Sequence, residues 1–203
     1  MNRIWPIAIV SAMLEIAIGC SPSPRVCNVD VLDTDNFYVE GQHCATNLLP
    51  SLRAIELGEA IMRVHIPSPE RFNLGRFVYF MWYAIDRSAG VLAIPEVGDI
   101  PFGVGPGFPC SLHRHRIAFT SSKLHYRKNG EIVTMPIGCF NQVCRMFREQ
   151  DKESTLELGF QGDRSMIEVM DLMKIAKVEG FKYLRICYYY GVVQDDGYDI
   201  IEL

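Results

Sequence analysis

Alternating hydrophobic and polar positions predict two similar series of short strands. The first series contains Val29 and Val31 between polar residues, a turn at 33–36 and a second apolar stretch at 37–41. The second contains residues 117–119, a turn near 121–123 and a strand over 124–130. A period of two, interrupted by turn residues, is typical of a hairpin. Each series therefore opens with a predicted β-hairpin.

Helical spacing follows each hairpin. Apolar residues recur three or four positions apart over 48–55 and 140–147, which predicts a short helix in each series. A further strand is expected at 60–66 and at 154–160.

A longer helix comes next in both series. Ser68, followed by proline and glutamate, supplies an N-cap and a suitable first turn. Ser165 and Glu168 form a capping-box pattern. We expect these helices to end at Gly90 and Gly180, because glycine favours the C-terminal cap.

Final strands at 91–94 and 183–188 complete the repeated pattern. We therefore expect an α+β protein made of two tandem ββαβαβ units, each a small sheet with two helices packed on one face. The units cover residues 28–97 and 113–203. Residues 98–112 are dense in glycine and proline, which favours a linker.

The first 20 residues have the layout of a bacterial export signal, with a basic start, an apolar core and a small residue before Cys20. The glycine–cysteine step resembles a lipobox, which would make Cys20 a lipidation site and residues 21–27 a tether. Ala17 and Glu15 depart from that motif. The alternatives are a buried N-terminal helix and a misassigned start.

Composition narrows the class of protein. The chain has 203 residues, of which 49% are hydrophobic and 22% charged, as in an ordered globular protein. A net charge of -4 provides no basic surplus for nucleic acid. No uncharged apolar run approaches 20 residues, which argues against a polytopic membrane protein.

Seven cysteines keep an oxidising compartment under consideration. Cys27 and Cys44 flank the first hairpin and are candidates for a disulfide, although a register that pairs Val31 with Val39 turns Cys44 to the other face. The rival interpretation is that most of these thiols are reduced and buried.

Residues with catalytic potential are sparse, and we expect no catalytic, cofactor-binding or metal-binding residues. His113 and His115 share a strand face, which could begin a metal site, but no acid stands at ligand spacing. His65 and His125 are expected at solvated or hydrogen-bonded strand positions. Residues 195–199 lack the spacing of a calcium loop.

The order of predicted elements resembles the periplasmic domain of the ExbD/TolR family. The closest similarity lies in residues 124–131 of the second hairpin and 167–173 of the second long helix. Proteins of this family couple the inner-membrane proton motor to Ton- or Tol-dependent work, and their periplasmic domains pair into dimers. Glu15 does not occupy the family's proton-carrying position, so the motor role does not transfer.

The resemblance implies an exported protein of the bacterial cell envelope, periplasmic or lipid-anchored, without enzymatic activity. We expect a binding or coupling module in biopolymer transport or envelope maintenance, with the two units forming a pseudo-dimer within one chain. Its partners would be envelope proteins of a Ton/Tol-type motor or peptidoglycan. One alternative is a metal-dependent or hydrolytic periplasmic enzyme using the inter-repeat region; another is a self-associating scaffold with pairing sheet edges.

Overall fold

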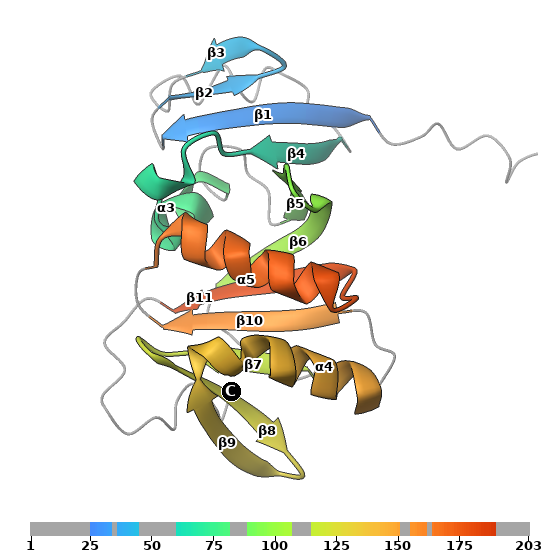
Figure 1. Ribbon diagram of the computed structural model, residues 1–203. Coiled ribbons are helices and arrows are strands. Elements are labelled where there is room, and N and C mark those ends of the chain that lie inside the picture. Colours follow the sequence, from blue (N-terminus) through green and yellow to red (C-terminus); the bar gives the residue numbers. More distant parts are fainter. Residues whose placement is uncertain are drawn as a thin grey trace, which may run out of the picture.

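A computed structural model describes residues 25–33, 36–44, 60–81, 89–106, 115–150, 155–161 and 164–189. Over these residues, eleven strands form one mixed sheet in the order β3-β2-β1-β4-β5-β6-β11-β10-β7-β8-β9 (Figure 1). The strands are β1 (Val26–Asp33), β2 (Asn36–Val39), β3 (Gln42–Cys44), β4 (Ile61–His65), β5 (Ala89–Ile94), β6 (Gly98–Pro106), β7 (Arg116–Phe119), β8 (Lys123–Lys128), β9 (Glu131–Pro136), β10 (Thr155–Gln161) and β11 (Tyr183–Tyr189). The helices are α3 (Leu74–Tyr79), α4 (Phe140–Gln150) and α5 (Met166–Val178), with short 3-10 turns η2 (Pro69–Arg71) and η4 (Ile137–Cys139).

The expectation of two separate ββαβαβ units, each with its own small sheet and two helices, is wrong. Strand β6 pairs antiparallel with β5 and parallel with β11, so the sheet continues from one half of the chain into the other. This strand occupies most of the segment expected to be a linker. Its prolines avoid the interior of the pairing with β11, because Pro101 precedes the first paired residue, Phe102, and Pro106 is the last.

Each half also contains a strand that the predicted units lack. Asn129 and Gly130 have φ values of 55° and 86°, and Glu40 and Gly41 have 51° and 77°. Two successive residues with positive φ form the tight turn that suits a β-hairpin. These turns lead into β9 and β3, which add a third antiparallel strand to each predicted hairpin.

The strand order nevertheless repeats within the single sheet. The order β3-β2-β1-β4-β5 in the first half matches β9-β8-β7-β10-β11 in the second. In each half the last three strands are parallel. Val64 pairs with Leu92 and Leu158 pairs with Ile186, a separation of 28 residues in each case. We call the two sets of strands the first and second repeat.

The long helix of the second half is confirmed, whereas that of the first begins later than expected. Ser165 caps α5 by accepting a hydrogen bond from the amide of Glu168. In the first half η2 follows Ser68, and α3 begins at Leu74 with Asn73 as its N-cap. Gly90, expected to end this helix, lies in β5, where an added Cβ would approach the carbonyl oxygen of Met62 at 2.8 Å. The helix predicted over 48–55 lies outside the described residues.

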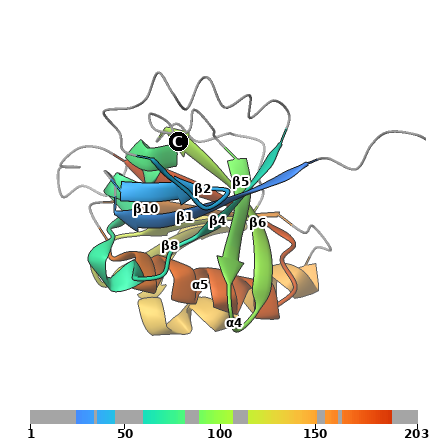
Figure 2. The ribbon, with the colours of Figure 1, turned by 90° about the horizontal axis from the view of Figure 1, so that it is seen from above.

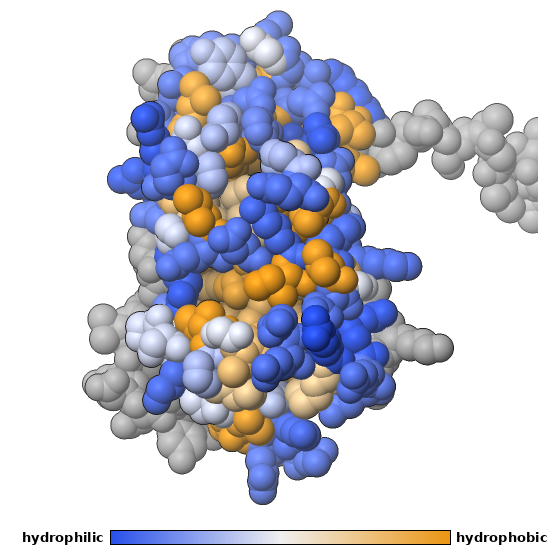
Figure 3. All heavy atoms as spheres, in the orientation of Figure 1, coloured by the Kyte–Doolittle hydropathy of each residue, from blue (hydrophilic) through white to orange (hydrophobic). Residues whose placement is uncertain are grey.

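Helices α4 and α5 lie side by side on one face of the sheet (Figures 1 and 2), and α3 contacts α5 and β11. The core lies between the helices and the sheet, because alternate strand residues such as Val29, Val64 and Leu158 are fully buried there. Polar residues cover most of the helical face of the molecule, and its exposed hydrophobic groups are small and scattered (Figure 3). The intervening strand residues point to the other face, which we call the open face; Arg63 and His65 are partly exposed there in the first half, whereas Glu157 and Cys187 are buried there in the second.

Candidate functional site

Several residues singled out by the sequence lie outside the described part of the chain. These are Cys20 with the rest of the signal-like segment, His113, and the acidic stretch at 195–199. Lipidation at Cys20 therefore stays a prediction.

The two cysteines proposed as a disulfide are not brought together. Cys27 lies on β1 and Cys44 on β3, with β2 between them, and both are buried free thiols. Neighbouring strands are about 4.8 Å apart, so two strand spacings already exceed the usual Cα separation of a disulfide. Burial also raises the pKa of the Cys27 thiol, with Glu40 adding to the effect. A bond between these residues would require the hairpin to rearrange.

His115, the described member of the proposed metal pair, packs inside the core. Its ring stacks on Phe147 at a centroid distance of 4.7 Å and meets the edge of Phe181 at 6.4 Å. The side chain is buried. Within the described ranges, no three His, Cys, Asp or Glu residues gather closely enough to hold a metal ion.

The other two histidines that the sequence singled out, His65 and His125, hydrogen-bond on the open face. His125 Nδ1 lies 2.9 Å from Thr134 Oγ1, and its Nε2 lies 3.3 Å from Thr120 Oγ1. Burial and Lys123 lower the pKa of His125. His65 Nδ1 lies 3.0 Å from Asp30 Oδ1, and both side chains are about half exposed.

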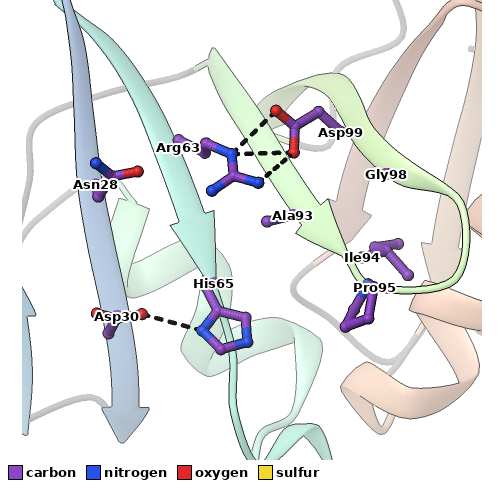
Figure 4. A pocket seen from close by; sticks show the side chains of 9 residues that line it. All are labelled: Asn28, Asp30, Arg63, His65, Ala93, Ile94, Pro95, Gly98 and Asp99. Carbon is purple, nitrogen blue, oxygen red and sulfur yellow. Dashed lines mark hydrogen bonds and ion pairs between the residues drawn. The ribbon is translucent and has the colours of Figure 1, made fainter.

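His65 belongs to a pocket on the open face of the first repeat. The pocket has a volume of about 340 Å³. Figure 4 shows Asn28 and Asp30 on one side and Asp99 on the other, with Arg63 and His65 between them. The remaining lining residues are Ala93, Ile94, Pro95 and Gly98.

Strand register places these side chains in a common hollow. Asp30 pairs with His65 across β1 and β4, and Ala93 pairs with Asp99 across β5 and β6. Two residues earlier on each strand, Asn28 lies opposite Arg63. The methyl group of Ala93 leaves space between larger polar neighbours, which accounts for the hollow.

Arg63 and Asp99 form a bidentate ion pair across the pocket. Arg63 Nε lies 3.0 and 2.9 Å from the two carboxylate oxygens, and Nη2 lies 2.9 Å from Oδ1. The Asp99 carboxylate raises the pKa of the Arg63 guanidinium through these hydrogen bonds. A fork-shaped pair of this kind fixes the orientation of both groups.

The lining side chains offer several hydrogen-bonding groups to a ligand. The lining residues offer two carboxylates, one guanidinium, one imidazole and one amide, but no hydroxyl or thiol nucleophile. Each carboxylate pairs with a basic group, so the side chains are held in place before any ligand arrives. Such preorganisation lowers the entropy cost of binding.

Sequence reasoning missed Asp30, Arg63 and Asp99. Asp30 and Arg63 stand at polar positions in alternating strands, where solvent exposure is the ordinary expectation, and Asp99 lies in the segment expected to be a linker. Arg63 and Asp99 are also 36 residues apart, and β6 was not recognised as a strand. The one signal that could have found these residues is the presence of opposite charges at polar positions of strands predicted to be neighbours, as for Asp30 on β1 and Arg63 on β4.

None of the helices in the described residues is long and apolar enough to cross a membrane. No protein-family model matches the chain, and no curated protein is significantly similar to it.

Proposed function

We propose that this protein is a non-enzymatic binding or coupling module of the bacterial cell envelope, similar in role to the periplasmic domains of the ExbD/TolR family. Its binding partners would be components of a Ton/Tol-type motor or peptidoglycan, and its binding site would include the pocket on the open face. The proposed location in the cell envelope rests on the first 20 residues, which have the layout of an export signal.

The observation that carries the proposal is the repeated strand order in one sheet. The second repeat runs through three antiparallel strands, α4, β10, α5 and β11. Apart from the additional strand β9, this order of strands and helices is the ββαβαβ order on which the resemblance to the family rests. Two such sets in one chain support the idea of a covalent pair, since both sets belong to one continuous sheet.

Pull-down from the native host tests the proposal. The tagged full-length protein would be incubated with purified sacculi and, separately, with solubilised envelope proteins. We expect retention on sacculi or co-purification of Ton/Tol motor components. Absence of both would contradict the proposal, and intact mass of the native protein would show whether Cys20 is cleaved and acylated.

Self-association is a second candidate because of the outermost strand in the second repeat. Strand β9 lies at one end of the described sheet, and Ile132 on it is 42% exposed. An edge strand presents backbone groups that can pair with another chain. Light scattering over a concentration series would show a growing mass if β9 mediates assembly, and a constant monomer mass would exclude this candidate.

A further inference from the structure

We propose that the pocket on the open face binds one uncharged, hydroxyl-rich ligand of the saccharide class per chain, and that the equivalent place in the second repeat is closed. This inference deepens the proposed binding function and rests on it. It follows from comparing the two repeats position by position.

Strand register defines the equivalent positions. Val31 pairs with Phe37 beside the first hairpin turn, as Phe119 pairs with Leu124 beside the second. Counting back three residues makes Asn28 equivalent to Arg116. Their partners on the next parallel strand are then equivalent as well, namely Arg63 on β4 and Glu157 on β10.

The two repeats carry opposite charge at this central position. Arg63 is 43% exposed in its side chain and lines the pocket, whereas the side chain of Glu157 is fully buried. Glu157 makes ion pairs with Arg116 at 2.5 Å and with Arg185 at 3.9 Å. The carboxylate therefore lies between two guanidinium groups and is closed to ligands.

The second repeat also lacks the other polar groups of the pocket. By the same register, Ala118 stands at the position of Asp30, and Gly159 at that of His65. Asp99 has no counterpart, because it lies on β6, the strand that joins the repeats. Only the first repeat can therefore hold a ligand at this place.

The hydrogen-bonding groups of the pocket indicate the ligand class. Among the described residues, Asp30 Oδ2, His65 Nε2 and Arg63 Nη1 have no hydrogen-bond partner, so both acceptors and donors remain for a ligand. A hydroxyl group donates and accepts, and it satisfies either kind.

Charge and shape point to the same class. Asp99 is paired with Arg63, and Asp30 is hydrogen-bonded to His65, so neither carboxylate nor the guanidinium stands alone to attract a strong cation or a strong anion. Ala93 and Pro95 add apolar surface, against which the carbon-bound hydrogens of a sugar ring can pack. Small-molecule sites combine apolar surface with a few polar groups that fix the ligand's orientation, and in this pocket the polar groups predominate.

Calorimetry with the purified full-length protein tests the assignment. The probes are N,N′-diacetylchitobiose, cellobiose and maltose, with inorganic phosphate and spermidine as charged controls. We expect at least one disaccharide to bind with one equivalent per chain. Asp30→Asn should weaken this affinity about tenfold, because it removes a hydrogen bond to a charged acceptor. Glu131→Gln on β9, at the far end of the sheet, should leave the affinity unchanged.

Several results would overturn the assignment. These are binding of none of the disaccharides up to about 10 mM, equal affinity of Asp30→Asn and the natural protein, two equivalents per chain, or preference for phosphate or spermidine.

Binding to sacculi separates this inference from the proposed function. If Asp30→Asn is retained on sacculi as well as the natural protein, the envelope role stands and the pocket assignment fails. If a disaccharide binds but neither sacculi nor motor proteins do, the pocket assignment stands for a soluble saccharide and the proposed function fails.

Discussion

Asn73 and Ser165 face each other in an antiparallel bridge at the start of α3 and α5. The amide that follows each residue donates to the carbonyl that precedes the other, at 2.7 and 2.9 Å. Each residue also caps its own helix through its side chain. Reciprocal contacts of this kind are typical of a two-fold interface between identical subunits. Here the two partners belong to one chain, and the contact ties the first repeat to the second.

Close packing between the repeats predicts the effect of a single added methyl group. Gly75 in α3 approaches β11 so closely that a Cβ would lie 2.9 Å from Tyr188 Oη. We expect Gly75→Ala to lower the free energy of unfolding by about 1 kcal/mol, because the shift forced on the Tyr188 ring outweighs the higher helix propensity of alanine. Urea denaturation measures the change. Gly138→Ala is the matched control, because no atom lies within 4 Å of its added Cβ, and equal stability of the two variants would contradict the packing described.

Two carboxylates on the open face should differ strongly in their effect on stability. Glu157→Gln removes the negative charge that Glu157 places beside two partly buried guanidinium groups, which should cost about 3 kcal/mol. Asp99→Asn removes an ion pair that is nearly half exposed, which should cost less than about 1 kcal/mol. Thermal and urea denaturation of both variants test this order, and a larger loss for Asp99→Asn would be inconsistent with the burial of Glu157.

His125 should make stability depend on pH. Burial lowers its pKa in the folded state below the ordinary value of 6.5. The unfolded chain then binds more protons between the two pKa values, so acidification through this range favours unfolding. We expect the unfolding free energy to fall more steeply from about pH 7 to pH 5 in the natural protein than in His125→Asn. Parallel slopes for the two proteins would argue against the lowered pKa.

The described cysteines should differ in their reactivity toward alkylating agents. Burial raises the pKa of Cys144 and of Cys187 to about 12, so almost no thiolate is present near neutral pH. Cys139 is only partly buried. Iodoacetamide labelling followed by peptide mass spectrometry should modify Cys139 in the folded protein, and Cys144 and Cys187 only after unfolding. Early modification of either buried thiol would contradict its position in the core.

The predictable parts of this fold are those with strong local signals. Ser165 and Glu168 mark the start of α5 because the cap is made by residues three positions apart. The spacing of Phe140, Val143 and Phe147 likewise predicts α4, on which all three are buried. Period-two alternation likewise locates the strands of both hairpins, because it is a pattern of neighbouring residues.

The unpredictable parts depend on distant partners. Residues 98–106 are rich in glycine and proline, and they form a strand only because β5 and β11 pair with them from both sides. The pocket depends on that strand, since Asp99 reaches Arg63 from β6. A local pattern cannot reveal this site, because Arg63 and Asp99 are 36 residues apart and the strand that carries Asp99 was not predicted.

The continuity of the sheet through β6 is the central structural claim, and amide hydrogen exchange tests it most directly. If β6 joins the two repeats, the amides of residues 99–105, apart from Pro101, should be protected to the same degree as those of β5 and β11, because they exchange only when the core opens. Exchange of these amides at the rate of an exposed linker, with β5 and β11 still protected, would contradict the single sheet.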